Sequence, residues 1–109
     1  MPQYLLIESR DPFDSNDATS FYDLASGLAK SGNAVTMFLV QNGVLPARAG
    51  TARSQALAAL GQAGVKLLAD EFSLRERGID AAKLVRGVQA APIDAVVDQM
   101  AEGCKALWH

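Results

Sequence analysis

Residues 64–79, GVKLLADEFSLRERGI, decide the fold, because a short apolar run in them leads directly into a helical pattern. Val65 to Ala69 form the apolar run, which is typical of a strand buried on both faces of a sheet. Phe72 to Arg77 predict a short helix that ends at Gly78. A strand followed at once by a helix is the unit from which parallel α/β sheets are built.

The same alternation of apolar strands and amphipathic helices continues on both sides of this stretch. Further strands are expected at residues 4–7, 34–40, 84–89 and 104–108. Further helices are expected from Asn16 or Asp17 to Leu28, from Thr51 or Ser54 to Leu60, and from Ile93 to Ala101. The chain therefore predicts one domain, residues 1–109, with a three-layer α/β/α architecture and a mainly parallel five-stranded sheet.

Composition and charge argue against two classes of partner. Half of the 109 residues are hydrophobic and 20% are charged, which is typical of a globular domain. The net charge of −2 gives no electrostatic reason to bind nucleic acid. The apolar runs are far shorter than the roughly 20 residues of a membrane-spanning helix. We therefore expect neither nucleic acid nor a membrane as a partner.

The start of the chain and its cysteine content favour a cytoplasmic location. Met1-Pro2-Gln3 leads straight into a predicted strand, without the basic and apolar regions of a signal peptide. Cys104 is the only cysteine, so an intramolecular disulfide and a multi-cysteine metal site are both excluded. Neither the P-loop pattern nor the Gly-x-Gly-x-x-Gly dinucleotide pattern occurs, and we expect no cofactor and no bound metal.

Four segments, taken in order, carry a resemblance to a known family. They are FYDLA at residues 21–25, GNAVTMFLVQNGV at residues 32–44, SLRERGI at residues 73–79, and a short last strand with Trp108. In order and spacing they resemble the DsrE-like (DsrE/DsrF-like) family of small sulfur-relay proteins. The resemblance implies the strand order 4-3-2-1-5, assembly into homotrimers or hexamers, and sulfur-relay proteins as partners.

Asp70 stands where many members of that family carry a reactive cysteine. The resemblance implies that the cysteine of those members carries sulfur as a persulfide, which requires an exposed and polarizable thiolate. A carboxylate cannot form a persulfide. We therefore expect this chain to lack sulfur-carrying chemistry at Asp70.

The polar residues that follow the third predicted strand form one candidate ligand site. Asp70 and Glu71 lie at the carboxyl end of that strand, where open α/β sheets bind their ligands. Ser73, Arg75 and Arg77 follow, and they offer a hydroxyl and two cations to an anion. We favour a competing interpretation, in which Asp70 caps the helix and Glu71 complements its dipole. In that interpretation Ser73, Arg75 and Arg77 lie on a solvated helix face, and the two arginines pair with Glu71 or Glu76.

The turn Asn42-Gly43-Val44 forms a second candidate site. It offers backbone amides, and Arg48 and Arg53 follow it close to an expected helix start. This combination is suited to phosphate or sulfate, although it matches no nucleotide-binding motif. The candidate ligand-binding residues are therefore Asp70, Glu71, Ser73, Asn42 and Gly43.

The remaining candidates have plain structural explanations. Asp11, Asp14 and Asp17 lack the spacing of a calcium-binding loop and are better explained by turns and helix capping. Cys104 is a free cysteine of the kind that is most often buried and inert. His109 is a lone imidazole without an evident partner, either native or left from a tag, and it supports no catalytic role.

These observations leave three functional hypotheses, and none of them assigns catalytic residues. We favour a DsrE-like protein without the sulfur-carrying cysteine, which serves as a non-catalytic, oligomeric binding or scaffold subunit linked to sulfur metabolism. The second hypothesis is an enzyme or small-ligand-binding protein that uses carboxylates at the strand ends. The third is a sulfurtransferase-type carrier whose reactive thiol is Cys104.

Overall fold

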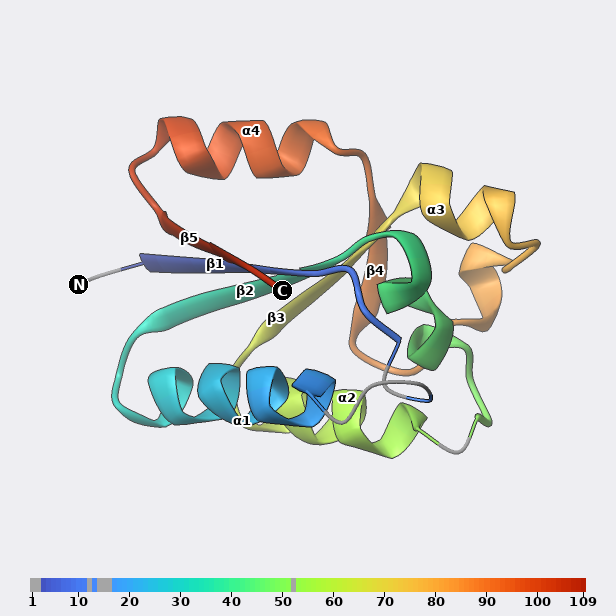
Figure 1. Cartoon of the computed structure of the whole chain (residues 1–109), viewed down its shortest axis with the longest axis horizontal. Helices are drawn as coiled ribbons and strands as arrows, with labels where there is room; N and C mark the ends of the chain where they lie inside the picture. Colours follow the sequence, from blue (N-terminus) through green and yellow to red (C-terminus); the bar gives the residue numbers. More distant parts are fainter. Residues whose placement is uncertain (1–2, 12, 14–16, 52) are drawn as a thin grey trace.

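The computed structural model describes residues 3–11, 13, 17–51 and 53–109, in which strands alternate with helices (Figure 1). The elements in chain order are β1 (Gln3–Glu8), α1 (Asp17–Lys30), β2 (Ala34–Leu39), the 3₁₀ helix η1 (Gln41–Ala47), α2 (Ser54–Gln62), β3 (Lys66–Asp70), α3 (Glu71–Glu76), the 3₁₀ helix η2 (Ala81–Lys83), β4 (Val88–Ala91), α4 (Asp94–Ala101) and β5 (Lys105–Trp108). No helix in these ranges has both the length and the apolar character needed to cross a membrane.

The five strands form one sheet in the order β4-β3-β2-β1-β5, and every neighbouring pair is parallel. This confirms the expected sheet, including the strand order that the family resemblance implies. α1 and α2 cover one face and α4 lies over the other, which gives the three layers (Figure 1). Because the strands are parallel, their carboxyl ends meet at one edge, where η1 follows β2 and α3 follows β3.

Side chains alternate along the strands and divide the core into two parts. The larger part packs against α1, α2 and η1, and it includes Leu6, Met37, Leu39, Leu57 and Leu67. The smaller part lies under α4 and includes Leu5, Ile7, Phe38, Leu68 and Val96. Burial on both faces explains why the three central strands, β1, β2 and β3, are mainly apolar rather than alternating in sequence.

Two parts of the chain differ from the sequence expectation. The fourth strand is β4 at Val88–Ala91 rather than residues 84–89, because the chain turns at Gly87, whose φ is +96°. Leu84 instead forms an isolated antiparallel bridge with Arg48. Residues 41–47, expected as a turn and loop, form η1, which packs against α3 at the carboxyl edge of the sheet.

Candidate functional site

Asp70 is the last residue of β3 and the N-cap of α3. Its Oδ2 atom accepts a hydrogen bond of 3.0 Å from the backbone N–H of Ser73. The hydroxyl of Ser73 donates a second bond of 2.7 Å to the same oxygen. The capping interpretation is therefore confirmed, and the carboxylate is occupied inside the fold, since Asp70 is only 9% exposed.

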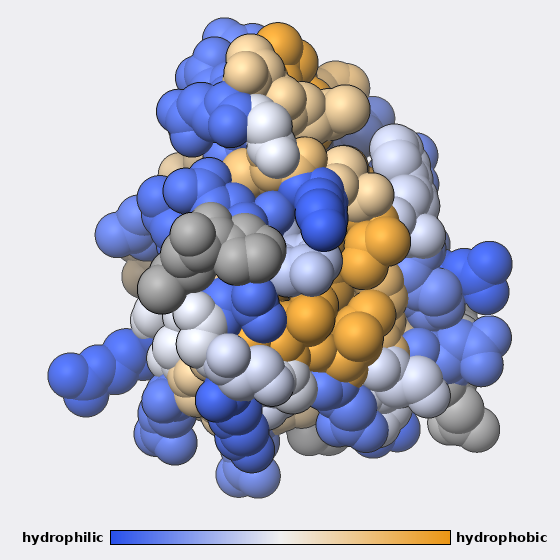
Figure 2. Space-filling model, turned by 90° about the vertical axis from the view of Figure 1, so that its left-hand side faces the viewer, coloured by the Kyte–Doolittle hydropathy of each residue, from blue (hydrophilic) through white to orange (hydrophobic). Residues whose placement is uncertain are grey.

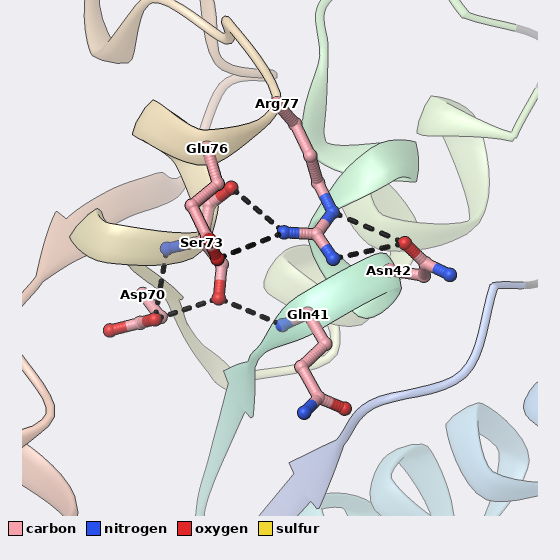
Figure 3. Close-up of polar contacts among 6 residues, drawn as sticks. All are labelled: Gln41, Asn42, Asp70, Ser73, Glu76 and Arg77. Atoms are coloured by element: carbon pink, nitrogen blue, oxygen red, sulfur yellow. Dashed lines mark hydrogen bonds and ion pairs between the residues drawn. The ribbon is translucent and has the colours of Figure 1, made fainter.

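Ser73 connects α3 to η1 (Figure 3). Its Oγ atom accepts a hydrogen bond of 2.8 Å from the backbone N–H of Gln41, in addition to the bond that it donates to Asp70. Gln41 has a positive φ of 52°, a conformation that is uncommon for residues other than glycine. Ser73 is buried, so the expectation of a solvated helix face is wrong for this residue, because η1 packs against α3 there.

Arg77 joins the end of α3 to the start of η1 (Figure 3). Its Nε and Nη2 atoms donate to Oδ1 of Asn42 at 3.2 and 3.1 Å, and its Nη1 atom donates to the carbonyl of Ser73 at 3.2 Å. The expected pairing with a neighbouring glutamate exists, but the Glu76 carboxylate is exposed and 3.8 Å away, so it contributes little. Arg75 is exposed, as expected.

The other two candidate residues have different surroundings. Gly43 is buried against the end of β1, where a Cβ atom would lie 2.9 Å from the carbonyl carbon of Glu8 and closer still to its oxygen. Only glycine therefore allows η1 to approach β1 so closely. Glu71 is exposed in the first turn of α3, where its charge complements the helix dipole. The residues that bond to one another across the two helices, here called the α3–η1 network, are Asp70, Ser73, Gln41, Asn42 and Arg77.

Glu8 and His109 form a second polar group at the same edge, which the sequence analysis misses. Glu8 is the last residue of β1 and is fully buried. The Nδ1 atom of His109 lies 3.0 and 3.1 Å from the two carboxylate oxygens of Glu8. The expectation that His109 has no partner is wrong, because β5 pairs with β1 in a register that places Trp108 beside Ile7. The available signal in the sequence is a carboxylate at the end of an otherwise apolar strand.

Burial and charge set the electrostatics around this pair. Burial raises the pKa of the Glu8 carboxyl above its ordinary value, while hydrogen bonds from the backbone N–H of Arg10 and from His109 act in the opposite direction. Burial, followed by the charges of Glu8 and Asp11, also raises the pKa of Tyr22. The hydroxyl of Tyr22 is buried and has no hydrogen-bond partner among the described residues.

The loop acids join neither group. Asp11 accepts a hydrogen bond from the backbone N–H two residues further on, and Asp17 forms an exposed ion pair of 3.7 Å with Arg10. Asp14 and the alternative helix start Asn16 lie outside the described residues. In the part of the chain that the structure describes, no three His, Cys, Asp or Glu side chains are grouped so as to hold a metal ion.

One cation from each of the two candidate anion sites lines the same cavity. Arg48 donates from Nε to the carbonyl of Leu45, and it lines a cavity of about 290 Å³ together with Arg77, Lys83 and Asp80. The backbone amides of the turn at residues 42–44 do not line this cavity. Arg48 and the turn with which the sequence grouped it therefore do not line one common cavity.

Cys104 lies at the opposite, amino-terminal edge of the sheet, immediately before β5. Its Sγ atom is 3.3 Å from Oε1 of Gln3 and 3.8 Å from Oε1 of Gln99, beside a cavity of about 380 Å³ next to α4. The length of the strands therefore separates this thiol from Asp70 and the α3–η1 network.

The fold and the site together define a small α/β protein with a parallel five-stranded sheet and a polar carboxyl edge. The DsrE/DsrF-like family model matches residues 3–108, and the chain belongs to this family. The ychN protein from E. coli has a similar fold, with a TM-score of 0.91 and 20% identity over 100% of both chains. MTH1491 from Methanobacterium thermoautotrophicum, a protein of unknown function, is also similar, with a TM-score of 0.87 and 18% identity over 100% of both chains. No curated protein gives a significant match.

Proposed function

We propose that this chain is a binding or scaffold subunit of a homo-oligomer linked to sulfur metabolism, without sulfur-carrying chemistry at the end of β3. The observation that carries the proposal is the state of Asp70, which occupies the position where the resemblance places a cysteine. Its carboxylate holds the first turn of α3 through Ser73. Family membership supports the link to sulfur metabolism and to sulfur-relay partners. The cytoplasmic location stays a prediction.

The two alternative functions find less support in the geometry. Asp70 and Ser73 are buried and already bond within the α3–η1 network, which makes them poorly placed to bind a small ligand. Cys104, the thiol of the carrier hypothesis, is half-buried at the opposite edge of the sheet. A sulfur carrier needs a thiolate that a donor can reach.

The outer surface of α4 supports assembly with further copies of the chain. Ile93, Val97 and Met100 recur at the spacing of one helix face and are 53, 61 and 54% exposed. Leu107 and Trp108 of β5 are exposed as well. Figure 2 shows apolar side chains gathered below α4 on the amino-terminal side of the sheet. Exposed apolar surface of this kind on a small domain is typical of a subunit contact, and we expect a trimer or hexamer.

Light scattering across micromolar concentrations tests the proposed assembly. We expect a trimer or hexamer for the wild type and a shift towards monomer for Val97→Asp, which places a charge in the middle of the apolar helix face. Leu24→Asp is the matched control, because Leu24 is an apolar residue of α1 that is 43% exposed. A wild type that stays monomeric would refute the assembly, and an unchanged Val97→Asp oligomer would place the contact away from α4.

Persulfide loading tests the proposed absence of sulfur-carrying chemistry. The native protein is incubated with a polysulfide donor and its mass is then measured, with Cys104→Ala as the blank. We expect no stable persulfide on the native chain, because its single thiol is half-buried and distant from the carboxyl edge. Stable loading of Cys104 would favour the carrier hypothesis instead.

A further inference from the structure

The imidazole of His109 is held in one orientation from several sides. Glu8 bonds its Nδ1 atom, and its ring stacks on Phe21, with centroids 5.2 Å apart and ring planes at 26°. Its backbone N–H donates to the carbonyl of Ile7, and its carbonyl accepts from the backbone N–H and the hydroxyl of Ser9. The position and tilt of the ring are therefore set before any ligand arrives.

Among the described residues, the other ring nitrogen, Nε2, has no hydrogen-bond partner, which leaves it for a ligand. An ionised carboxylate only accepts hydrogen bonds, so Nδ1, which lies 3.0 and 3.1 Å from the Glu8 oxygens, carries the hydrogen. The ring then presents the lone pair of Nε2, and the side chain of His109 is 21% exposed. A carboxylate bonded to one nitrogen of an imidazole fixes which tautomer the ring adopts.

Three observations argue against a purely structural tie. Burying a carboxylate costs desolvation energy that a hydrogen bond only partly offsets, so packing alone does not account for the fully buried Glu8. The hydroxyl of Tyr22, which is near enough to Glu8 to feel its charge, is buried without a hydrogen-bond partner among the described residues. Such unsatisfied groups are uncommon and call for an explanation. The pair also lies at the carboxyl edge, where α/β sheets bind their ligands.

We propose that His109 is a proton-accepting site for a small ligand that brings its own acidic O–H or S–H group, and that Glu8 positions its imidazole. The proton moves from the ligand to Nε2, the hydrogen on Nδ1 stays bonded to Glu8, and the ligand remains as an anion beside the imidazolium. The transfer requires no electron donor or further reactant. Glu8 and His109 together change from a net negative charge to neutrality, which favours the transfer at a buried position.

Among the described residues, the serine beside the pair does not supply the acidic group. Ser9 is the serine beside the pair, and its hydroxyl donates to the carbonyl of His109 and accepts a bond of 3.2 Å from Nε1 of Trp108. The Ser9 hydroxyl therefore bonds to the His109 backbone and the Trp108 side chain and not to the imidazole. This inference does not rest on the proposed scaffold function, which concerns the end of β3.

Diethyl pyrocarbonate tests the site, because it acylates the unprotonated nitrogen of an accessible imidazole and the chain has a single histidine. We expect native His109 to react at least as fast as N-acetylhistidine at the same pH. In Glu8→Gln the rate should fall, because a neutral amide no longer fixes the Nδ1–H tautomer that leaves Nε2 unprotonated. His109→Gln is the blank for reaction elsewhere, and Glu71→Gln, which alters an exposed carboxylate of α3, is the matched control.

Nitrogen NMR of the one imidazole reports the tautomer without any variant. We expect the Nδ1–H tautomer of neutral His109 in the wild type. A native ring that reacts more slowly than N-acetylhistidine, or an Nε2–H tautomer, would overturn the proposal, and both measurements need only the wild-type chain. A Glu8→Gln rate equal to that of the wild type would also overturn it, because a purely structural tie changes stability and not the reactivity of Nε2.

Discussion

Replacing Ser73 with alanine tests the α3–η1 network most directly, because one hydroxyl links β3, α3 and η1. This hydroxyl donates a bond of 2.7 Å to the Asp70 carboxylate and accepts one of 2.8 Å from Gln41. A hydrogen bond to a charged group contributes about 1.5–3 kcal/mol and a neutral one about 0.5–1.5 kcal/mol. Alanine offsets roughly 0.5 kcal/mol through its better helix propensity. We therefore expect Ser73→Ala to lower the free energy of unfolding by about 1.5–4 kcal/mol.

Urea unfolding followed by circular dichroism measures this loss. The protomer concentration is kept constant, because assembly makes the apparent stability depend on concentration. Thermal unfolding should show a Tm lower by about 6–16 °C, at roughly 4 °C per kcal/mol for a domain of this size. Ser20→Ala is the matched control, since Ser20 is exposed in α1 and its removal should change stability by no more than about 0.5 kcal/mol.

A double-mutant cycle separates the bond between Asp70 and Ser73 from side effects of either substitution. Asp70→Ala alone should lower stability by about 0.5–2 kcal/mol, the usual effect of losing an N-cap. The loss caused by Ser73→Ala should be smaller in that background, with a coupling energy of about 0.5–3 kcal/mol. If Ser73→Ala behaves like Ser20→Ala, or if the cycle shows no coupling, the network does not hold α3 against η1 and the reasoning is wrong.

Three further outcomes are expected. Gly43→Ala should destabilise the protein by about 1–3 kcal/mol, because its Cβ atom would overlap the Glu8 carbonyl. The control Gly27→Ala has open space around its Cβ atom in α1 and should stabilise the protein by about 0.5–1 kcal/mol. Equal melting temperatures of the two variants would contradict this expectation. The raised pKa of Glu8 means that the folded state binds this proton more tightly than the unfolded state. The stability that Glu8 contributes is therefore present below its ordinary pKa of 4.5 and is lost as the pH rises through the folded-state pKa. The free energy of unfolding should consequently fall with rising pH in the wild type relative to Glu8→Gln. Parallel profiles of urea unfolding against pH would argue against this. Thiol labelling of Cys104 should be slower in the native chain than in the unfolded chain, because the side chain is half-buried beside Gln3; equal rates would show an open thiol.

The strands and the helix cap could be predicted because both leave a local trace in the sequence. Burial on two faces favours an uninterrupted apolar run, as at residues 4–7 of β1, and the cap of α3 involves residues only three positions apart. The start of β4 leaves no such trace. It depends on the turn at Gly87 and on the bridge between Leu84 and Arg48, which are 36 positions apart in the numbering (84 − 48).

The polar groups of the site depend on contacts between distant segments, and that explains which of them the sequence missed. Glu8 and His109 are separated by 101 positions, and only the parallel pairing of β1 with β5 brings them together. Ser73 was expected on a solvated face because the helical pattern of α3 says nothing about η1. Its partner there is the backbone of Gln41, whose left-handed conformation no residue type in the turn signals.

η1 connects the polar residues at the carboxyl ends of β3 and β1. β2 lies between β3 and β1, so the helix that follows β2 contacts the ends of both neighbours. Towards β3, Gln41 and Asn42 bond to α3 through Ser73 and Arg77; towards β1, Gly43 packs on the carbonyl of Glu8. A seven-residue 3₁₀ helix is unusually long, and contacts on both sides account for its persistence. The end of β3, where the family resemblance places a reactive cysteine, is therefore a structural contact in this chain, and the reactive group proposed here lies instead between the ends of β1 and β5.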